Sequence, residues 1–257
     1  MIGGILKKYC FFLAMMNLLL AGNVSAAGFF SADDGISGKE LWYSDGSAVG
    51  TRLVADINPG AEKSLPFHVK SVQHGHLFSA NDGYRGYELW RTDGTEQGTW
   101  LVRDIHVGSG HSFPLFFIPC GKLTCFSADD GNAGKELWVT DGSEEGTRML
   151  TDIFPGSSGS RPNHMTRVGD RMFFGADDGI HGYELWITDG TVDGTRLVMD
   201  IFPGAEGSTL TKLIEVDGQL YFGANDGEHG LELWVSDGSP EGTHMVLDIN
   251  HGPPSSM

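Results

Sequence analysis

The chain has 257 residues, which is enough for one domain with a sizeable core and too few for two large ones. Its 34 acidic side chains outnumber its 17 basic ones, and its formal net charge is −17. Such a surface repels phosphate groups. We therefore expect the protein to bind neither nucleic acid nor anionic lipid. Cations, sugars and basic proteins are the partners that the composition favours.

The first 26 residues have the features of a signal peptide. A positively charged start is followed by an apolar stretch over residues 9–21 and by small residues up to Ala26. The apolar stretch is shorter than the roughly 20 residues that cross a bilayer, which favours a cleaved signal over stable membrane insertion. We therefore expect cleavage near Ala26, one domain over residues 27–257, and a secreted, periplasmic or cell-surface protein.

Two of the three cysteines, Cys120 and Cys125, flank a four-residue turn. An exported protein permits them to form a disulfide, and two free buried thiols are the alternative. A bridge over so short a loop would stabilise the fold by about 2 kcal/mol at most on the chain-entropy model.

One sequence frame recurs five times at a constant interval of 48 residues. It reads Phe-x-Ala-[Asp/Asn]-Asp-Gly-x-x-Gly-x-Glu-Leu-Trp-x-[Ser/Thr]-Asp-Gly-[Ser/Thr]-x-x-Gly-Thr. Copies this alike must occupy equivalent environments, so the chain is predicted to be a repeat protein. The five units are centred on Glu40, Glu88, Glu136, Glu184 and Glu232.

Each unit carries the pattern of four short strands. In the second unit these are expected at about residues 66–73, 76–80, 88–92 and 99–105, with Asn-Asp-Gly or Asp-Gly-Thr turns between them. Asp-Gly and Asn-Gly favour the left-handed backbone of tight hairpins. Each unit is therefore predicted to be a four-stranded antiparallel meander.

Five such units predict an all-β fold, a five-bladed β-propeller. Strands such as residues 196–201 are apolar on both faces, as expected where neighbouring sheets cover both. The first unit enters at its second strand, residues 29–32, so the first blade is expected to lack its innermost strand. An open or linear repeat array is the alternative.

The repeated motif Glu-Leu-Trp-x-[Ser/Thr]-Asp-Gly-[Ser/Thr] resembles the bacterial ELWxxDGT repeat family of exported proteins. The resemblance covers nearly all of the chain after the signal. It implies a propeller-like fold and no catalytic residues. Five blades of this length are also similar in architecture to the tachylectin type of sugar-binding propeller, although architecture does not fix function.

The tryptophans of the frame fall at one strand position in every unit, and we expect them to pack between blades. The alternative is a ring of platforms on which sugars stack. These residues are Trp42, Trp90, Trp138, Trp186 and Trp234.

Acidic side chains also recur, around the first Asp-Gly turn of each unit. Clustered oxygen ligands in a glycine-rich loop suit Ca²⁺, and the alternative is that these side chains bond the turn backbone and hold the hairpin. The candidate ligands are Asp33, Asp34, Glu40, Asp82, Glu88, Asp129, Asp130, Glu136, Asp177, Asp178, Glu184, Asp226 and Glu232.

The loop before each Glu-Leu-Trp varies while the frame around it stays constant. Variable loops on a rigid scaffold are a common way to build a binding surface. We expect these loops to share one rim, and the candidate ligand contacts are Arg85, Tyr87, His181 and Tyr183.

These observations predict an exported, non-enzymatic binding or adhesion module that recognises a glycan or protein at the rim, with calcium as a candidate stabilising ion. One alternative is a structural segment of a cell-surface assembly, with self-association through an unpaired blade edge. A polysaccharide-acting hydrolase is the other, since paired carboxylates abound. Catalysis needs one asymmetric constellation, however, and these carboxylates recur in equivalent sites.

Overall fold

The structure, a computed structural model, describes residues 27–73, 75–249 and 251. The expected signal peptide lies outside these residues. Within them the chain forms nineteen β-strands and no helix, so none of the described segments is a helix that could cross a membrane. The prediction of an all-β fold is confirmed.

The strands form five antiparallel sheets in sequence order. The first sheet has three strands, β1 (Gly28–Asp33), β2 (Lys39–Ser44) and β3 (Arg52–Ala55). The second contains β4 (Phe67–Val72), β5 (Gly75–Asn81), β6 (Tyr87–Thr92) and β7 (Trp100–Arg103), and the third contains β8 (Leu115–Cys120), β9 (Leu123–Asp129), β10 (Lys135–Thr140) and β11 (Arg148–Thr151). The fourth contains β12 (Asn163–Val168), β13 (Arg171–Asp177), β14 (Tyr183–Thr188) and β15 (Arg196–Met199), and the fifth contains β16 (Thr211–Val216), β17 (Gln219–Asn225), β18 (Leu231–Ser236) and β19 (His244–Leu247). Both the four-stranded meander and the shorter first sheet agree with the sequence prediction.

Neighbouring sheets pack face to face through the tryptophans. Trp90 and Phe78, which are paired across β5 and β6, lie in one buried cluster with Leu41, Val54 and Ile57 of the first sheet. Equivalent clusters join the later sheets, and Trp138 and Trp234 are also buried. A buried Trp removes roughly 150–250 Å² from water, so these contacts make a large contribution to the packing. The expected role between sheets is confirmed for Trp90, Trp138, Trp186 and Trp234, whereas Trp42 of the first sheet is only half-buried.

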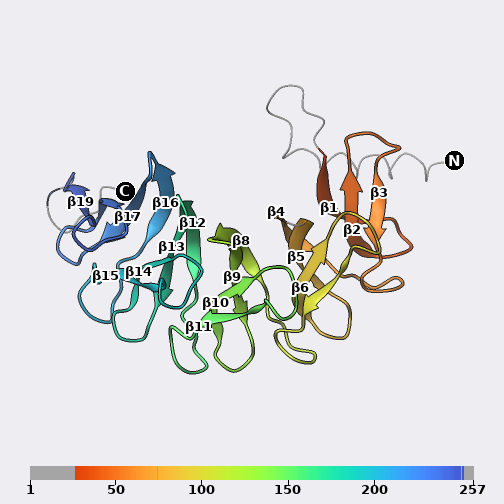
Figure 1. Cartoon of the computed structure of the whole chain (residues 1–257), viewed down its shortest axis with the longest axis horizontal. Helices are drawn as coiled ribbons and strands as arrows, with labels where there is room; N and C mark the ends of the chain where they lie inside the picture. Colours follow the sequence, from red (N-terminus) through yellow and green to blue (C-terminus); the bar gives the residue numbers. More distant parts are fainter. Residues whose placement is uncertain (1–26, 74, 250, 252–257) are drawn as a thin grey trace.

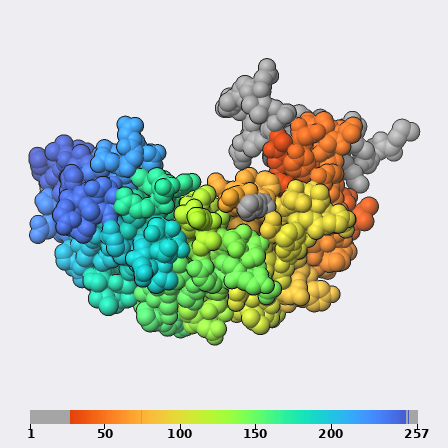
Figure 2. Space-filling model, in the orientation of Figure 1, coloured from red at the N-terminus to blue at the C-terminus, as the bar shows by residue number. Residues whose placement is uncertain are grey.

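The five sheets follow one another along an open arc (Figure 1). The first sheet, in orange, and the fifth, in blue, lie at opposite ends of it. The filled outline in Figure 2 is concave between the two ends. The molecule therefore has the sheet order and the face-to-face packing expected of propeller blades, arranged here along an open arc.

A buried glutamate fixes the linker between each pair of sheets. The Glu88 carboxylate accepts hydrogen bonds from the amide of Ile105 (2.7 Å) and from the amide (3.0 Å) and hydroxyl (2.6 Å) of Ser112. Its side chain is fully buried, and its carboxylate gives these buried linker groups an acceptor away from water. The same bonds recur around Glu40 and Glu136. The Glu of the repeat therefore sets where the next sheet begins.

Replacement of a central glutamate tests this role. Glu136→Ala leaves the amides of Ile153, Phe154 and Ser160 without the acceptor that they have in the wild type. We expect the free energy of unfolding to fall by about 3–5 kcal/mol, measured by urea denaturation. The control is Glu145→Ala, which truncates an exposed glutamate of the same repeat and should change stability by about 0.5 kcal/mol or less. Equal effects of the two variants would contradict the proposed role of the buried carboxylate.

Candidate functional site

The aspartates of the first turn bond the turn itself. The Asp34 carboxylate accepts hydrogen bonds from the amides of Ile36 and Ser37, both at 2.8 Å, and Asp33 accepts one from Gly35 at 2.7 Å. The amides of Ser37 and Ile36 hold the pKa of Asp34 below its usual value. The other four repeats contain the same turn, with Asn81 and Asn225 in place of the first Asp in two of them, so these recurring side chains act as turn-forming groups.

The glutamates of the candidate metal set point to other partners. The carboxylates of Glu40, Glu88, Glu136 and Glu184 face the linker amides, whereas the aspartates of the same units face their own turn amides. The described residues contain no group of three or more His, Cys, Asp or Glu side chains arranged to hold a metal. Calcium binding by this set stays a prediction, and the geometry favours the turn-forming role.

The second Asp-Gly turn is a closed network of hydrogen bonds. The Asp141 carboxylate accepts from the amide and the hydroxyl of Ser143, at 2.8 and 2.6 Å. The Ser143 hydroxyl accepts from the Gly146 amide, and the Thr147 hydroxyl donates to the Ser143 carbonyl oxygen. The bonds from Ser143 hold the pKa of Asp141 below its usual value. This network explains why the frame repeats Asp-Gly-[Ser/Thr]-x-x-Gly-Thr.

Two of the four candidate contacts are tied to their own turns. Arg85 forms an ion pair with Asp82, with 2.6 Å between Nη1 and Oδ2, and His181 lies 2.7 Å from Asp178 between Nδ1 and Oδ2. The hydrogen bond with Asp178 raises the pKa of His181. Both side chains are partly exposed, but their polar heads already have partners.

Tyr183 lies against the hydrophobic core. Its ring packs over Gly175 of the neighbouring strand, where an added Cβ would lie 2.5 Å from the phenolic oxygen. Burial raises the pKa of the Tyr183 hydroxyl. Since its ring is used for packing, Tyr183 is a poor candidate for a ligand contact.

Tyr87, the fourth candidate, lies at the centre of an aromatic group that we call the Tyr87 cluster: Phe67, Tyr87, His111 and Phe113. The rings of Tyr87 and Phe113 stack at 5.3 Å between centroids, with 20° between their planes. Phe67 meets Tyr87 edge-on at 5.4 Å, and His111 lies 5.5 Å away. Phe113 is 39% exposed, so the cluster presents an aromatic surface to solvent.

The linker after the second sheet builds this cluster. The Tyr87 carbonyl oxygen accepts from the amides of Ser112 (3.0 Å) and Phe113 (3.2 Å), and the Tyr87 amide donates to Nδ1 of His111 (3.0 Å). Gly86 permits the close approach, because a Cβ there would lie 1.7 Å from the Gly110 carbonyl oxygen. The position of the aromatic surface thus depends on the backbone path that Glu88 fixes.

The Tyr87 cluster occurs at one boundary between sheets, although the backbone around it repeats. At the next boundary the four equivalent positions hold Leu115, Lys135, Gly159 and Arg161. At the boundary after that they hold Asn163, Tyr183, Gly207 and Thr209. The cluster is therefore an asymmetric feature on a symmetric scaffold.

Three members of this cluster, Phe67, His111 and Phe113, are not among the candidate contacts predicted from the sequence. Aligning the repeats would have shown that each is an aromatic or histidine departure from its equivalents. It would not have shown that they meet Tyr87, since His111 and Phe113 lie in a linker whose path the strand pattern does not predict.

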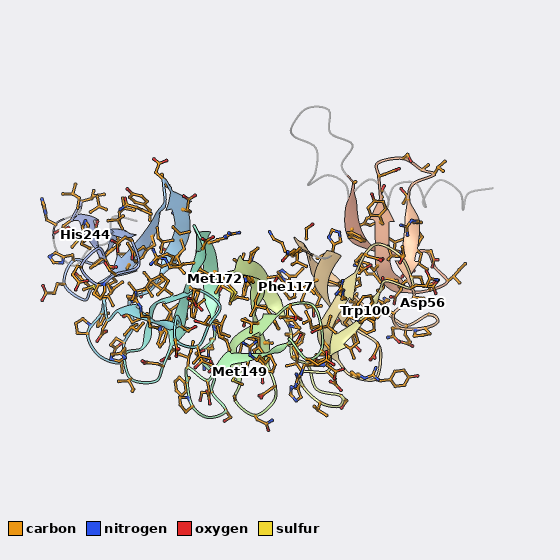
Figure 3. All side chains as sticks on the ribbon, viewed as in Figure 1. Asp56, Trp100, Phe117, Met149, Met172 and His244 are labelled. Carbon is orange, nitrogen blue, oxygen red and sulfur yellow. A yellow bond between two sulfur atoms is a disulfide. The ribbon has the colours of Figure 1, made fainter. Side chains whose placement is uncertain are left out.

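A cavity of about 240 Å³ lies between the second and third sheets, and Arg91, Lys122 and Asp141 are among its lining residues. The guanidinium of Arg91 donates to the Gly142 carbonyl oxygen at 3.1 Å and lies 4.4 Å from the centre of the Trp100 ring. Figure 3 labels Trp100 on β7. Because Arg91 is held by these contacts, the cavity is a weaker candidate site than the Tyr87 cluster.

Cys120 and Cys125 form a disulfide across the turn between β8 and β9. Both cysteines are buried in the cluster between the third and fourth sheets. The disulfide therefore covalently links β8 and β9, the first two strands of the third sheet.

Comparisons with known proteins give structural neighbours only. No protein-family model and no curated protein matches the chain. Two crystal structures of puromycin hydrolase match at 14% identity. The structure of a mutant complexed with PGG has a TM-score of 0.46, and the second structure has a TM-score of 0.44. Each match covers 88% of this chain and 39% of the hydrolase chain, so the chain spans well under half the length of these neighbours.

The buried glutamates predict a pH dependence of stability. Burial raises the pKa of Glu184 to about 7, against hydrogen bonds from Ser208, Phe202 and Ile201 that lower it. The folded state then holds this proton more tightly than the unfolded chain does. The resulting stability is present below the usual pKa of 4.5 and is lost as the pH rises through about 7.

We therefore expect the melting temperature to fall between pH 5 and pH 8, and to fall less in Glu184→Gln. The raised pKa of His181 acts in the same direction. Glu206→Gln, which changes an exposed side chain in the following linker, should keep the wild-type pH dependence. Identical pH profiles for wild type and Glu184→Gln would contradict the prediction.

Thermal melts with calcium and with chelator test the acidic turns. Because the Asp carboxylates are engaged by turn amides, we expect equal melting temperatures in the two conditions. A ligand that binds only the folded state raises the melting temperature by mass action. A rise of several degrees in calcium would instead assign the turns as calcium sites.

Proposed function

We propose that the protein is an exported, non-enzymatic binding or adhesion module that holds a glycan on the Tyr87 cluster. The scaffold is propeller-like, with face-to-face sheets around an axis, in keeping with the resemblance to the ELWxxDGT repeat proteins. The proposed ligand surface lies at the boundary between the second and third sheets and does not extend along the whole rim.

The single occurrence of the Tyr87 cluster carries this proposal. A pyranose ring has an apolar face of C–H groups and a rim of hydroxyls, so it fits a surface that is aromatic in the middle and polar at the edge. Phe113 and Tyr87 supply the aromatic face, and the His111 ring supplies a polar group beside it. Aromatic side chains with one wet edge are typical of such recognition surfaces.

The state of the carboxylates favours binding over hydrolysis. A glycoside hydrolase uses two carboxyl groups that flank the scissile bond and reach the substrate. Here the Glu88 carboxylate is buried and bonded to linker amides, and the Asp82 carboxylate is bonded to its own turn and to Arg85. Neither is arranged to approach a sugar on the Tyr87 cluster.

Removal of the exposed ring tests the site. Phe113→Ala should weaken binding to a glycan identified on an array of immobilised oligosaccharides by about tenfold, because a stacking contact contributes about 1–1.5 kcal/mol. Titration calorimetry gives the dissociation constants, and thermal melts check that the variant is folded.

Leu65→Ala is the matched control. Leu65 is the repeat equivalent of Phe113, with the same left-handed backbone (φ 46° and 44°) and a similar exposure, but it lies at the first boundary. This variant should bind like the wild type. An array without a glycan ligand, or equal loss in both variants, would overturn the proposal.

A further inference from the structure

The four internal contacts between sheets are built from the same repeat positions. One sheet contributes the Leu of Glu-Leu-Trp, a Val or Leu of its outer strand, and the Ile that follows that strand. At the first contact these are Leu41, Val54 and Ile57. The next sheet contributes the opposite set, which includes Phe78 and Trp90 at the first contact. Each internal sheet therefore has one face that carries the Leu, Val or Leu, and Ile positions and an opposite face that carries the Phe and Trp positions.

Among the described residues, nothing packs as a further sheet on the outer face of the fifth sheet. Val246 is 47% exposed and Ile249 is 59% exposed, whereas their equivalents Val198 and Ile201 are 2% and 3% exposed. Leu233 is half-buried, whereas the equivalent leucines of the other sheets are fully buried. The residues that pack at every internal contact are thus in place at this end of the arc, without a neighbouring sheet among the described residues.

The first sheet carries the complementary face at the other end. Phe30, Ala32 and Trp42 stand at the positions of Phe78, Ala80 and Trp90, which are buried against the preceding sheet. All three are only half-buried. Figure 3 shows the separation of the ends, with Asp56 labelled on the side of the first sheet and His244 on the fifth.

We propose that two copies of the chain associate head to tail, with the fifth sheet of each packed on the first sheet of the other. The contact continues the interface that the chain already builds four times. A head-to-tail contact forms a ring when its rotation closes, and two open arcs joined at both ends cover all four end faces. The contact uses sheet faces and does not require pairing of an exposed strand edge.

Polar groups at the ends fit the same arrangement. Within the chain, Arg196 of β15 donates to the Gly238 carbonyl oxygen of the next sheet at 2.7 Å. The fifth sheet has His244 at the position of Arg196, and the first sheet has Gly46 at the position of Gly238. A head-to-tail contact would bring this donor and acceptor together between copies.

The net charge of −17 adds a condition to the assembly. Two such chains repel each other, and salt screens that repulsion while apolar contacts persist. The proportion of associated chains should therefore rise with ionic strength.

Light scattering coupled to size-exclusion chromatography tests the proposal over a concentration series in low and high salt. We expect the wild type at high concentration and salt to have twice the mass of one chain. Val246→Asp and Ile249→Asp, each on the exposed face of the fifth sheet, should give the mass of one chain. The matched control is Val192→Asp, which introduces the same charge at a valine that is 57% exposed in a turn of the fourth sheet and should leave the mass at two chains.

A mixing experiment tests the direction of the contact. Phe30→Asp places the charge on the face of the first sheet and should also give single chains, with circular dichroism and a melt to check that it is folded. An equal mixture of Phe30→Asp and Val246→Asp retains one intact contact and should form a two-chain species. A mixture that stays at the mass of one chain would overturn the head-to-tail arrangement.

A wild type that stays at the mass of one chain in every condition would overturn the proposal, and so would a dimer that both end-face variants leave intact. If the first and fifth sheets of one chain packed on each other, the protein would stay at the mass of one chain, which is the first of these outcomes. Glycan binding is a separate measurement, because the end-face variants leave the Tyr87 cluster unchanged.

Discussion

The buried carboxylate of each Glu-Leu-Trp unit is the interaction on which the rest of the architecture depends. A strand pattern can specify a hairpin, but it does not specify the path of the linker between two sheets. At the second boundary Glu88 supplies that partner from inside the sheet and bonds both Ile105 and Ser112. The carboxylate thereby fixes the two ends of the linker, and with them the point at which the next sheet starts.

Repetition of this device has two consequences for function. It makes the backbone nearly the same at every boundary, so most recurring polar residues are explained by turns and linkers. It also makes departures from the repeat informative, because the fold does not require them. The Tyr87 cluster is such a departure, and its rings meet because the linker held by Glu88 brings Phe113 over Tyr87.

Face-to-face packing also has a consequence at the ends of the arc. Each internal sheet buries both faces, since its neighbours supply complementary apolar surfaces. The same sequence frame places the same apolar residues on the first and fifth sheets, where Trp42 and Val246 are more exposed than most of their equivalents. The described first and fifth sheets therefore carry the apolar residues of the internal contacts on their outer faces.

The sequence by itself determined the all-β class, the five units, the four-stranded meander and the short first sheet, because these follow from local turn chemistry and strand periodicity. It also placed the tryptophans between sheets, since one apolar position recurring in every unit must occupy equivalent environments. Only the tertiary structure decided what the acidic residues do. Asp34 and Glu40 are close in sequence, but the first bonds its own turn and the second bonds a linker 17 to 24 residues later. The open arc and the meeting of Tyr87 with Phe113 likewise depend on the linker path and on the angle between packed sheets, which strand and turn patterns do not encode.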